Sequence, residues 1–215
     1  MPLDTTDLRV NYDLDKLLES HAPDEPMALF EQWFLAAQQA DALEPNAMIV
    51  ATVKPGGIPS ARVVLLKEVT KDGFIFYSNY QSHKGRELAE NPNTALVFNW
   101  LELQRQVRIE GVAEQIPAEK SEAYFHSRPI GSQLGAIASP QSQVIPNREP
   151  LERRMAELKE EYGNESKAPK PAHWGGYLVR PQLIEFWQGR KSRLHDRLVY
   201  SKLDSGSWSR IRLAP

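Results

Sequence analysis

Short runs rich in apolar residues recur along the chain, and some of them alternate apolar and polar positions with the period of two that is typical of β-strands. The runs are residues 47–53, 58–67, 74–77, 94–100, 104–115, 176–179, 183–188, 193–201 and 208–213. Glycine-containing turns join several consecutive runs, and such short connections imply antiparallel pairing. We therefore predict a mainly antiparallel β fold in which around eight strands form a closed or nearly closed barrel, because closure removes exposed strand edges.

Other segments have the spacing of amphipathic helices, which we expect at the periphery of this sheet. Leu29, Phe30 and Trp33 recur at helical spacing, and Ser82 is a typical helix N-cap. The predicted helices are a segment that starts at residue 26, residues 82–90, two short helices within 118–138 that break at 128–131, and residues 148–162.

Length and composition are those of a globular protein that can bury a core. The chain has 215 residues, of which 41% are hydrophobic and 25% are charged. Residues 1–25 are polar without a sustained period, so we predict a mobile N-terminal arm followed by a single domain of residues 26–215.

Charge and residue usage exclude several functions. The formal net charge of −2 argues against a dedicated nucleic-acid binder. The absence of cysteine excludes disulfides, thiolate nucleophiles and cysteine metal sites, and we expect no bound metal. No segment approaches the roughly 20 apolar residues of a membrane span, and no leader pattern is present, so we expect a soluble, cytoplasmic protein.

The C-terminal stretch 185–197 carries an Arg-x-His-x-Arg pattern. If residues 193–201 form a strand, Arg193, His195 and Arg197 share one face, whereas Leu194 and Asp196 point the other way. Like charges held this close require an anion or an electron-rich ring opposite them. The alternative is a solvated edge strand whose charges oppose aggregation.

Two clusters near the middle of the chain could each bind an anion. Arg62 and Lys67 would lie on opposite faces of a regular strand and roughly 16 Å apart, so they would serve two different anions or simply reach solvent. Tyr77 and Ser78 precede a helix start at Ser82 that also carries His83 and Lys84. A helix N-terminus with a hydroxyl and a lysine suits an anion, although capped helices with nearby lysines are common.

A third cluster and two single residues complete the candidates. Tyr124, Arg128 and Ser132 are four residues apart and could clamp a phosphate, or they could form a capped helix junction. Gln106 could bond the edge of a heterocycle or lie at the surface, and Trp187 could pack on an aromatic ring or belong to the core.

Ordered blocks over nearly the whole chain resemble the pyridoxine/pyridoxamine 5'-phosphate oxidase family. The blocks are residues 62–67 (Arg-Val-Val-Leu-Leu-Lys), 76–79 (Phe-Tyr-Ser-Asn), 105–107 (Arg-Gln-Val), 124–129 (Tyr-Phe-His-Ser-Arg-Pro), 141–142 (Gln-Ser), 174–176 (Trp-Gly-Gly), the 185–197 stretch and the ending 212–215 (Arg-Leu-Ala-Pro). The resemblance implies the split-barrel fold, flavin mononucleotide (FMN) as cofactor, and a homodimer with FMN at the subunit interface.

The resemblance also implies roles for individual residues. For FMN it implies Arg62, Val63, Val64, Leu65, Leu66, Lys67, Tyr77, Ser78, His83, Lys84, Gln106, Gln141, Ser142, Trp187 and Arg197. For the substrate it implies Arg9, Tyr12, Lys67, Tyr124, Arg128, Ser132, Arg193, Leu194 and His195, with Arg193 and His195 as the catalytic pair. His83 stands where the family often has arginine, and Val10 and Asn11 depart from its commoner charged pair in the arm.

The implied activity is the oxidation of pyridoxine 5'-phosphate and pyridoxamine 5'-phosphate to pyridoxal 5'-phosphate by O2, which gives H2O2. Two other functions stay open at the level of the sequence. A split-barrel protein could bind flavin or a vitamin B6 phosphate without catalysis, or arginines and aromatic residues on a barrel could bind single-stranded nucleic acid.

Overall fold

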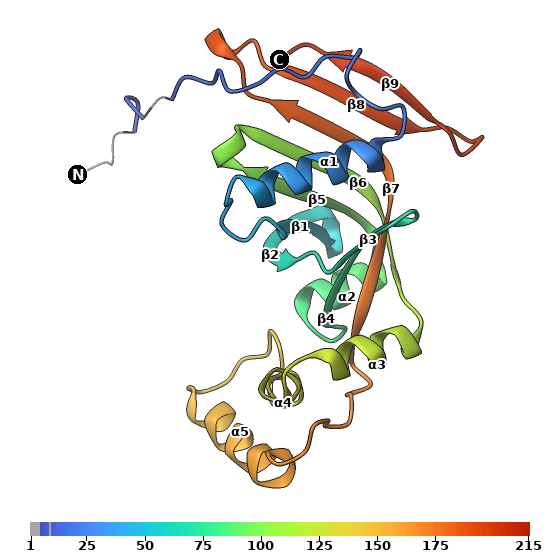
Figure 1. Ribbon diagram of the computed structural model, residues 1–215. Coiled ribbons are helices and arrows are strands. Elements are labelled where there is room, and N and C mark those ends of the chain that lie inside the picture. The colour runs from blue at the N-terminus through green and yellow to red at the C-terminus, as the bar shows by residue number, and fades with distance from the viewer. Residues whose placement is uncertain (1–4, 9) are drawn as a thin grey trace. The chain divides into compact units, whose positions relative to one another are not determined.

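The computed structural model describes residues 5–8 and 10–215 (Figure 1). The contacts among these residues divide them into two compact units. The first unit contains the chain up to Ile49 together with Ala95–Glu110 and Pro181–Pro215. The second unit contains Val50–Thr94 and Gly111–Arg180. The arm at residues 1–25 and the single domain at 26–215 stay predictions.

The strands confirm the mainly antiparallel β prediction. They are β1 (Ala47–Lys54), β2 (Ile58–Leu65), β3 (Glu68–Thr70), β4 (Gly73–Asn79), β5 (Asn93–Trp100), β6 (Arg105–Gln115), β7 (Trp174–Gln188), β8 (Asp196–Lys202) and β9 (Trp208–Leu213). Their hydrogen-bonded order is β2-β1-β5-β6-β7-β4-β3, and β8 pairs with both β7 and β9. The ladders β3–β4, β4–β7, β7–β8 and β8–β9 are antiparallel.

Helices lie where the sequence predicts them. They are α1 (Pro26–Gln39), α2 (His83–Glu90), α3 (Ala118–Ser127), α4 (Ile130–Ala138) and α5 (Glu149–Tyr162). The Ser82 hydroxyl accepts the Gly85 N–H at 3.2 Å and caps α2. Pro129 separates α3 from α4, because proline disfavours helical backbone at Arg128, which is extended. No helix in the described part of the chain is long and apolar enough to cross a membrane.

Aromatic packing forms the core of the first unit. Phe30 of α1 meets Phe98 of β5 edge-on, with ring centroids 5.0 Å apart. Trp33, one turn further along α1, contacts Phe186 of β7 at 5.3 Å. The apolar face that the sequence assigns to this helix is therefore buried against strands.

Two clusters form the core of the second unit. Phe76 of β4 stacks on Tyr177 of β7 with ring centroids 5.4 Å apart. Leu134 of α4 and Leu158 of α5 form a second cluster that also buries Ala168. The helices α4 and α5 thus pack on each other through their apolar stripes.

The strand β7 is continuous, whereas the sequence pattern predicts two strands at 176–179 and 183–188. Its first part pairs with β4 up to Val179, and its second part pairs with β8 from Leu183. Pro181 lies between the β4 ladder and the β8 ladder, where neither β4 nor β8 needs the N–H that proline lacks. The prediction of a break is therefore wrong because the proline falls at a change of partner.

The prediction of a strand from residue 193 is also wrong. Lys191–Arg193 is a single 3-10 turn, and β8 begins only at Asp196. Ser192 and Arg193 have positive φ angles of 57° and 60°, which no strand tolerates. Alternation along a strand therefore does not place Arg193 and His195 on one face with Arg197.

Candidate functional site

The second unit contains a pocket of about 750 Å³ that collects most of the candidate residues from its part of the chain. Its lining is Arg62, Val63, Val64, Leu65, Lys67, Tyr77, Ser78, Asn79, Lys84, Tyr124, Arg128, Ser132, Gly135, Ala136, Ser139, Gln141 and Trp174. Segments that lie far apart in the sequence thus form one cavity of a size that suits a cofactor or a substrate.

Arg62 is held in the pocket wall by several acceptors. Its Nη2 lies 2.7 Å from the Ser60 hydroxyl and 3.0 Å from the Glu87 carboxylate, and its Nη1 donates to the Thr52 hydroxyl. The Thr52 hydroxyl in turn donates to Glu87. Burial acts to raise the pKa of Glu87, but the bonds from Thr52 and Arg62 outweigh it and hold that pKa below its usual range.

Lys84 provides a second cation in the same wall. Its Nζ lies 3.0 Å from the Ser78 hydroxyl and 3.4 Å from the Gln141 side-chain oxygen. Burial lowers the pKa of Lys84, and the charge of Arg62 lowers it further. A Cβ at Gly85 would overlap the Tyr80 backbone, so glycine is needed where α2 begins. Two cations beside a helix N-terminus form a site for a multiply charged anion.

A stack of aromatic rings lines another part of the pocket. Tyr77 and Tyr124 lie parallel with centroids 3.9 Å apart, and Trp174 stacks on Tyr77 at 5.4 Å. Burial raises the pKa of Tyr77 to about 12, so its hydroxyl stays protonated at neutral pH. The stack thus provides an aromatic wall in which the Tyr77 hydroxyl can donate a hydrogen bond.

The guanidinium of Arg128 has one buried nitrogen from which no group in the described part of the chain accepts a hydrogen bond. Its guanidinium lies 4.8 Å from the Trp174 ring centroid, and its Nη2 donates to the Ser132 carbonyl at 2.7 Å. Its Nη1 is buried and has no acceptor, and no other side-chain atom in the described residues shares that condition. Burial lowers the pKa of Arg128. A buried donor without a partner is costly, which points to an anionic ligand at this position.

The strand β2 contributes apolar surface to the pocket. Val63 is 65% exposed although it is a large hydrophobic residue, and Val64 and Leu65 follow it in the lining. Lys67 also lines the pocket, together with Arg62. The regular strand on which the opposite-face prediction depended ends at Leu65, so the alternation does not extend to Lys67.

Some candidates of the second unit lie outside the pocket lining. Leu66 is buried, Ser142 is exposed with a φ of 70°, and His83 lines a different hollow with Lys54 and Arg86. The structure thus gives Lys84 a place in the pocket and gives none to His83.

The remaining described candidates belong to the first unit. A hollow of about 360 Å³ is lined there by Tyr12, Arg193 and His195 among others. The Trp187 ring lies 4.6 Å from the His195 ring and 5.9 Å from Tyr12. Leu194 is exposed, and Arg9 lies outside the described residues. The His195 imidazole therefore lies against two aromatic rings, and Arg193 lines the same hollow.

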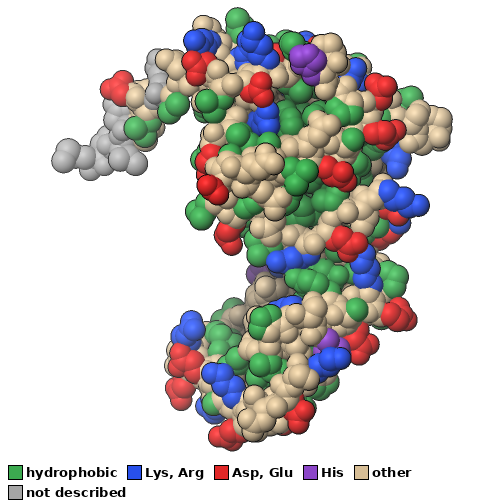
Figure 2. Space-filling view, viewed as in Figure 1, with side chains coloured by type: hydrophobic (Ala, Val, Ile, Leu, Met, Phe, Trp, Pro, Cys, Tyr) green, Lys and Arg blue, Asp and Glu red, His purple; other side chains and the backbone are tan. Residues whose placement is uncertain are grey.

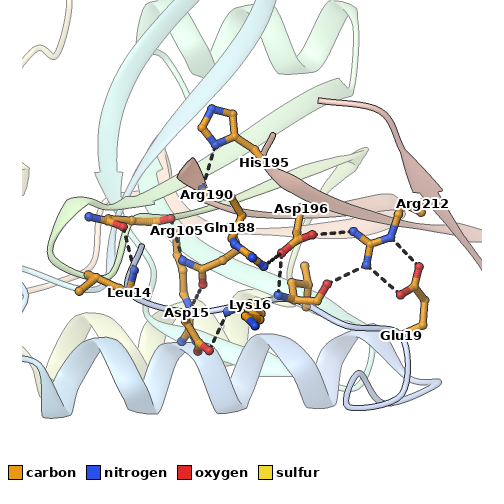
Figure 3. Close-up of polar contacts among 12 residues, drawn as sticks. Leu14, Asp15, Lys16, Glu19, Arg105, Gln188, Arg190, His195, Asp196 and Arg212 are labelled. Carbon is orange, nitrogen blue, oxygen red and sulfur yellow. Dashed lines mark hydrogen bonds and ion pairs between the residues drawn. The ribbon is translucent and has the colours of Figure 1, made fainter. Parts of the chain in front are cut away.

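One ring nitrogen of His195 has a defined partner. Its Nδ1 accepts the Arg190 N–H at 3.0 Å, as Figure 3 shows, so the neutral ring carries its proton on Nε2. Burial lowers the pKa of His195, and the neighbouring charge of Arg193 lowers it further. His195 is therefore a neutral donor through Nε2 at neutral pH.

Arg197 and Gln106 also belong to the first unit. Arg197 donates from Nε to the Glu185 carboxylate at 2.7 Å and from Nη1 to the Ala214 carbonyl at 3.1 Å. Gln106 lies half-buried in β6. Arg197 is thus largely committed to partners in the protein.

Sequence reasoning missed four residues that shape the pocket. Thr52, Ser60 and Glu87 hold Arg62, and Trp174 supports both Tyr77 and Arg128. Trp174 had a signal, since it opens one of the blocks that resemble the family. Thr52 and Glu87 had none, because they lie 10 and 25 residues from Arg62, and the nearby Ser60 belongs to no recognisable pattern.

Comparison with known families identifies the chain. Residues 35–162 match the family described as "Pyridoxamine 5'-phosphate oxidase", and residues 174–215 match "Pyridoxine 5'-phosphate oxidase C-terminal dimerisation region". The chain belongs to the pyridoxamine 5'-phosphate oxidase family. The resemblance noted in the sequence is thereby confirmed.

Relatives named as members of this family match nearly the whole chain. Pyridoxine/pyridoxamine 5'-phosphate oxidase of Microcystis aeruginosa is 54% identical over 215 residues, which is 100% of each chain. The relative of the same name from Salinibacter ruber is 53% identical and covers 97% of this chain and 98% of its own.

Two solved structures extend the comparison to the fold. PhzG from Burkholderia lata, crystallised with tetrahydrophenazine-1-carboxylic acid, has a TM-score of 0.87 at 31% identity over 94% of this chain and 99% of its own. A pyridoxamine 5'-phosphate oxidase-related, FMN-binding protein from Nostoc punctiforme has a TM-score of 0.70 at 15% identity over 90% and 100% of the two chains, and it shares the fold. The fold is the split barrel with peripheral helices that the sequence predicts.

Proposed function

We propose that this chain is an FMN-dependent oxidase that converts pyridoxine 5'-phosphate and pyridoxamine 5'-phosphate to pyridoxal 5'-phosphate. Relatives that carry this activity in their names match the chain over its full length. The observation that carries the proposal is the charge of the pocket. It contains one cationic group at Arg62 and Lys84 and a second at Arg128, and the reaction needs places for two phosphates.

The residues present fit FMN. Arg62, Lys84 and the N-terminus of α2 would hold its phosphate, and the exposed β2 surface at Val63 would lie along its ring. Further contacts expected from the family are those of Val64, Leu65, Leu66, Lys67, Tyr77, Ser78, Gln106, Gln141, Ser142, Trp187 and Arg197. Bound FMN supplies a reversible two-electron acceptor. His83, at the edge of another hollow, gains no support for such a contact.

The substrate phosphate would lie at the second cationic group. Arg128 would donate from the Nη1 that has no protein acceptor, while Tyr124, Ser132 and Lys67 lie in the same lining. A guanidinium fork suits a phosphate, and the Trp174 ring already fixes its plane. These residues would bind and orient the substrate.

Arg193 and His195 are the proposed catalytic pair, with Tyr12, Leu194 and Arg9 as further substrate contacts. The held Nδ1 of His195 leaves Nε2–H free to donate to the substrate, and the Arg193 charge would stabilise negative charge that develops in the reaction. We also propose a homodimer, supported by the match of residues 174–215 to a dimerisation region. A cytoplasmic location completes the proposal.

The overall reaction balances with O2 alone for the alcohol and with O2 and water for the amine. Oxidation of the alcohol removes two electrons and two protons from the substrate, and O2 takes them up to give H2O2. The amine route consumes one water in addition and releases ammonia. Both routes end at the same aldehyde.

The rival functions lack a comparable observation. A non-catalytic flavin or B6-phosphate carrier would need the Arg62 and Lys84 group but has no use for Arg193 and His195. For the nucleic-acid alternative, Figure 2 shows basic and acidic side chains interspersed over the visible surface. That mixture is unlike the basic stripe of nucleic-acid binders.

Aerobic turnover tests the proposal. The protein reconstituted with FMN should convert either substrate to pyridoxal 5'-phosphate with one H2O2 per aldehyde, and ammonia should appear only with the amine. A protein that binds FMN but forms no aldehyde from either substrate would be a carrier, and the proposed activity would be wrong.

A further inference from the structure

The carboxylate of Asp196 joins three segments of the first unit (Figure 3). Its Oδ2 accepts from Arg190 Nη1 at 2.9 Å and from the Leu17 N–H at 3.1 Å. Its Oδ1 accepts from Arg212 Nη1 at 2.8 Å. The side chain is only 14% exposed, so these charge-assisted bonds lie largely out of water. One carboxylate therefore links the turn after β7, the N-terminal segment and the last strand.

Arg212 extends this link along the N-terminal segment. It binds both oxygens of Glu19, from Nε at 2.6 Å and from Nη2 at 2.8 Å, and Nη2 also donates to the Leu17 carbonyl at 2.8 Å. The hydrogen bond from Arg212 lowers the pKa of Glu19 to about 2, so the pair stays charged at neutral pH. Leu17 is thus held through its N–H by Asp196 and through its carbonyl by Arg212.

The other side of the link is the turn that carries Arg193 and His195. Arg190 donates its N–H to His195 Nδ1 and its guanidinium to Asp196, which closes the turn on itself. Tyr12 rests on the start of this turn, because a Cβ at Gly189 would lie 2.8 Å from the Tyr12 ring. The Tyr12 and His195 ring centroids are 5.8 Å apart.

We propose that Asp196 is a positioning residue that keeps Tyr12 and the turn of Arg193 and His195 in one arrangement. The inference rests on the proposed function, in which these three residues meet the substrate. It gives a reason for Asp196 in the C-terminal stretch and for Arg212 in the last residues of the chain, neither of which binds cofactor or substrate in the proposal.

Other contacts also hold the N-terminal segment. Asp15 pairs with Arg105, and the Gln104 side chain accepts the Asp13 and Leu14 N–H groups while its carbonyl accepts the Gly189 N–H. None of these bonds involves Leu17 or residues 190–196. Lys191 of the turn does pair with Asp13 at 3.2 Å, but their side chains are 71% and 52% exposed. Exposed pairs contribute little, so Asp196 carries the buried link between Leu17 and residues 190–196.

The test compares Asp196→Asn with the matched control Asp13→Asn in the FMN-loaded protein. The N–H that Asp196 accepts belongs to the peptide bond between Lys16 and Leu17, which trypsin cleaves only when the segment is released. In Asp196→Asn we expect cleavage after Lys16 to accelerate at least tenfold and kcat with pyridoxine 5'-phosphate to fall about tenfold, with unchanged FMN affinity. Asp13→Asn should match wild type in cleavage rate, in kcat and in FMN affinity.

The cleavage rate tests the link through Asp196, and kcat tests the positioning role. Unchanged cleavage in Asp196→Asn would overturn the link, and faster cleavage with wild-type kcat would overturn the positioning role. If that variant does not fold, Glu19→Gln replaces it, since Glu19 is half exposed and lies at the rim of the link. It should accelerate cleavage after Lys16 severalfold, and an unchanged rate would overturn the link. If the wild-type protein shows no turnover, the proposed function is wrong. The rate of cleavage after Lys16 would still show whether Asp196 holds the N-terminal segment.

Discussion

The Arg62 guanidinium and the Glu87 carboxylate form an ion pair in the wall of the pocket, with Nη2 and Oε2 3.0 Å apart. The Glu87 side chain is 7% exposed and that of Arg62 is 21% exposed. Glu87 does not itself line the pocket. It therefore acts as an internal counter-ion, and a phosphate that binds Arg62 competes with it for the same guanidinium.

The first prediction concerns Glu87→Gln. Loss of the carboxylate leaves Arg62 without its counter-ion, so the free energy of unfolding should fall by about 1–3 kcal/mol. FMN should bind roughly three- to tenfold more tightly than to wild type, because its phosphate takes the place of the lost charge. Fluorescence titration with FMN and with riboflavin measures this, and riboflavin should bind unchanged.

Glu90→Gln is the control, since it removes an exposed charge from the same helix. Weaker binding of FMN to Glu87→Gln than to wild type would contradict the counter-ion role.

The second prediction separates Lys84 from His83. Lys84→Gln removes the buried cation that we propose binds the FMN phosphate, so FMN affinity should fall roughly 10- to 100-fold. His83→Gln should leave it within about twofold, because His83 faces another hollow. Equal losses of FMN affinity in the two variants would show that the FMN phosphate does not lie at Lys84.

The third prediction concerns Arg128→Ala. The variant loses a donor that has no protein acceptor, so KM for pyridoxine 5'-phosphate should rise roughly 10- to 100-fold while kcat changes less. Steady-state kinetics measure both, with Arg154→Ala on the exposed face of α5 as the control. A fall in kcat at unchanged KM would assign Arg128 a role other than phosphate binding.

The fourth prediction concerns the pKa of His195. Burial and Arg193 lower it, so the ring should be neutral at neutral pH and its proton uptake should begin only below the usual histidine range near 6.5. Unfolding releases the ring to an ordinary pKa, so this group favours the unfolded state as pH falls below that range. In Arg193→Gln the pKa should rise, as NMR titration of the ring would show. A pKa that stays the same or falls would remove Arg193 as a cause.

The strands and helices follow from local pattern, whereas the turn at Lys191–Arg193 does not. Periods of two and of 3.6 are visible in the sequence, and Pro129 marks the break between α3 and α4. The positive φ angles at Ser192 and Arg193 carry no such signal, because neither residue is glycine. The alternation argument for Arg193 and His195 failed for that reason.

Only some of the residues that form the pocket could be predicted from the sequence. Residue type and the family resemblance indicated Arg62, Lys84 and Arg128. Neither could reveal that Glu87 neutralises Arg62, or that Asp196 binds Leu17, since those bonds join residues 25 and 179 positions apart. Long-range partners become visible only when the fold brings them together.

The visible spectrum of the FMN-loaded protein tests the central claim most directly. Pyridoxine 5'-phosphate added without oxygen should bleach the flavin band, and admission of air should restore it with formation of pyridoxal 5'-phosphate. The two half-reactions would then be established on the protein itself. A flavin band that stays unchanged when the substrate saturates the protein would contradict the account.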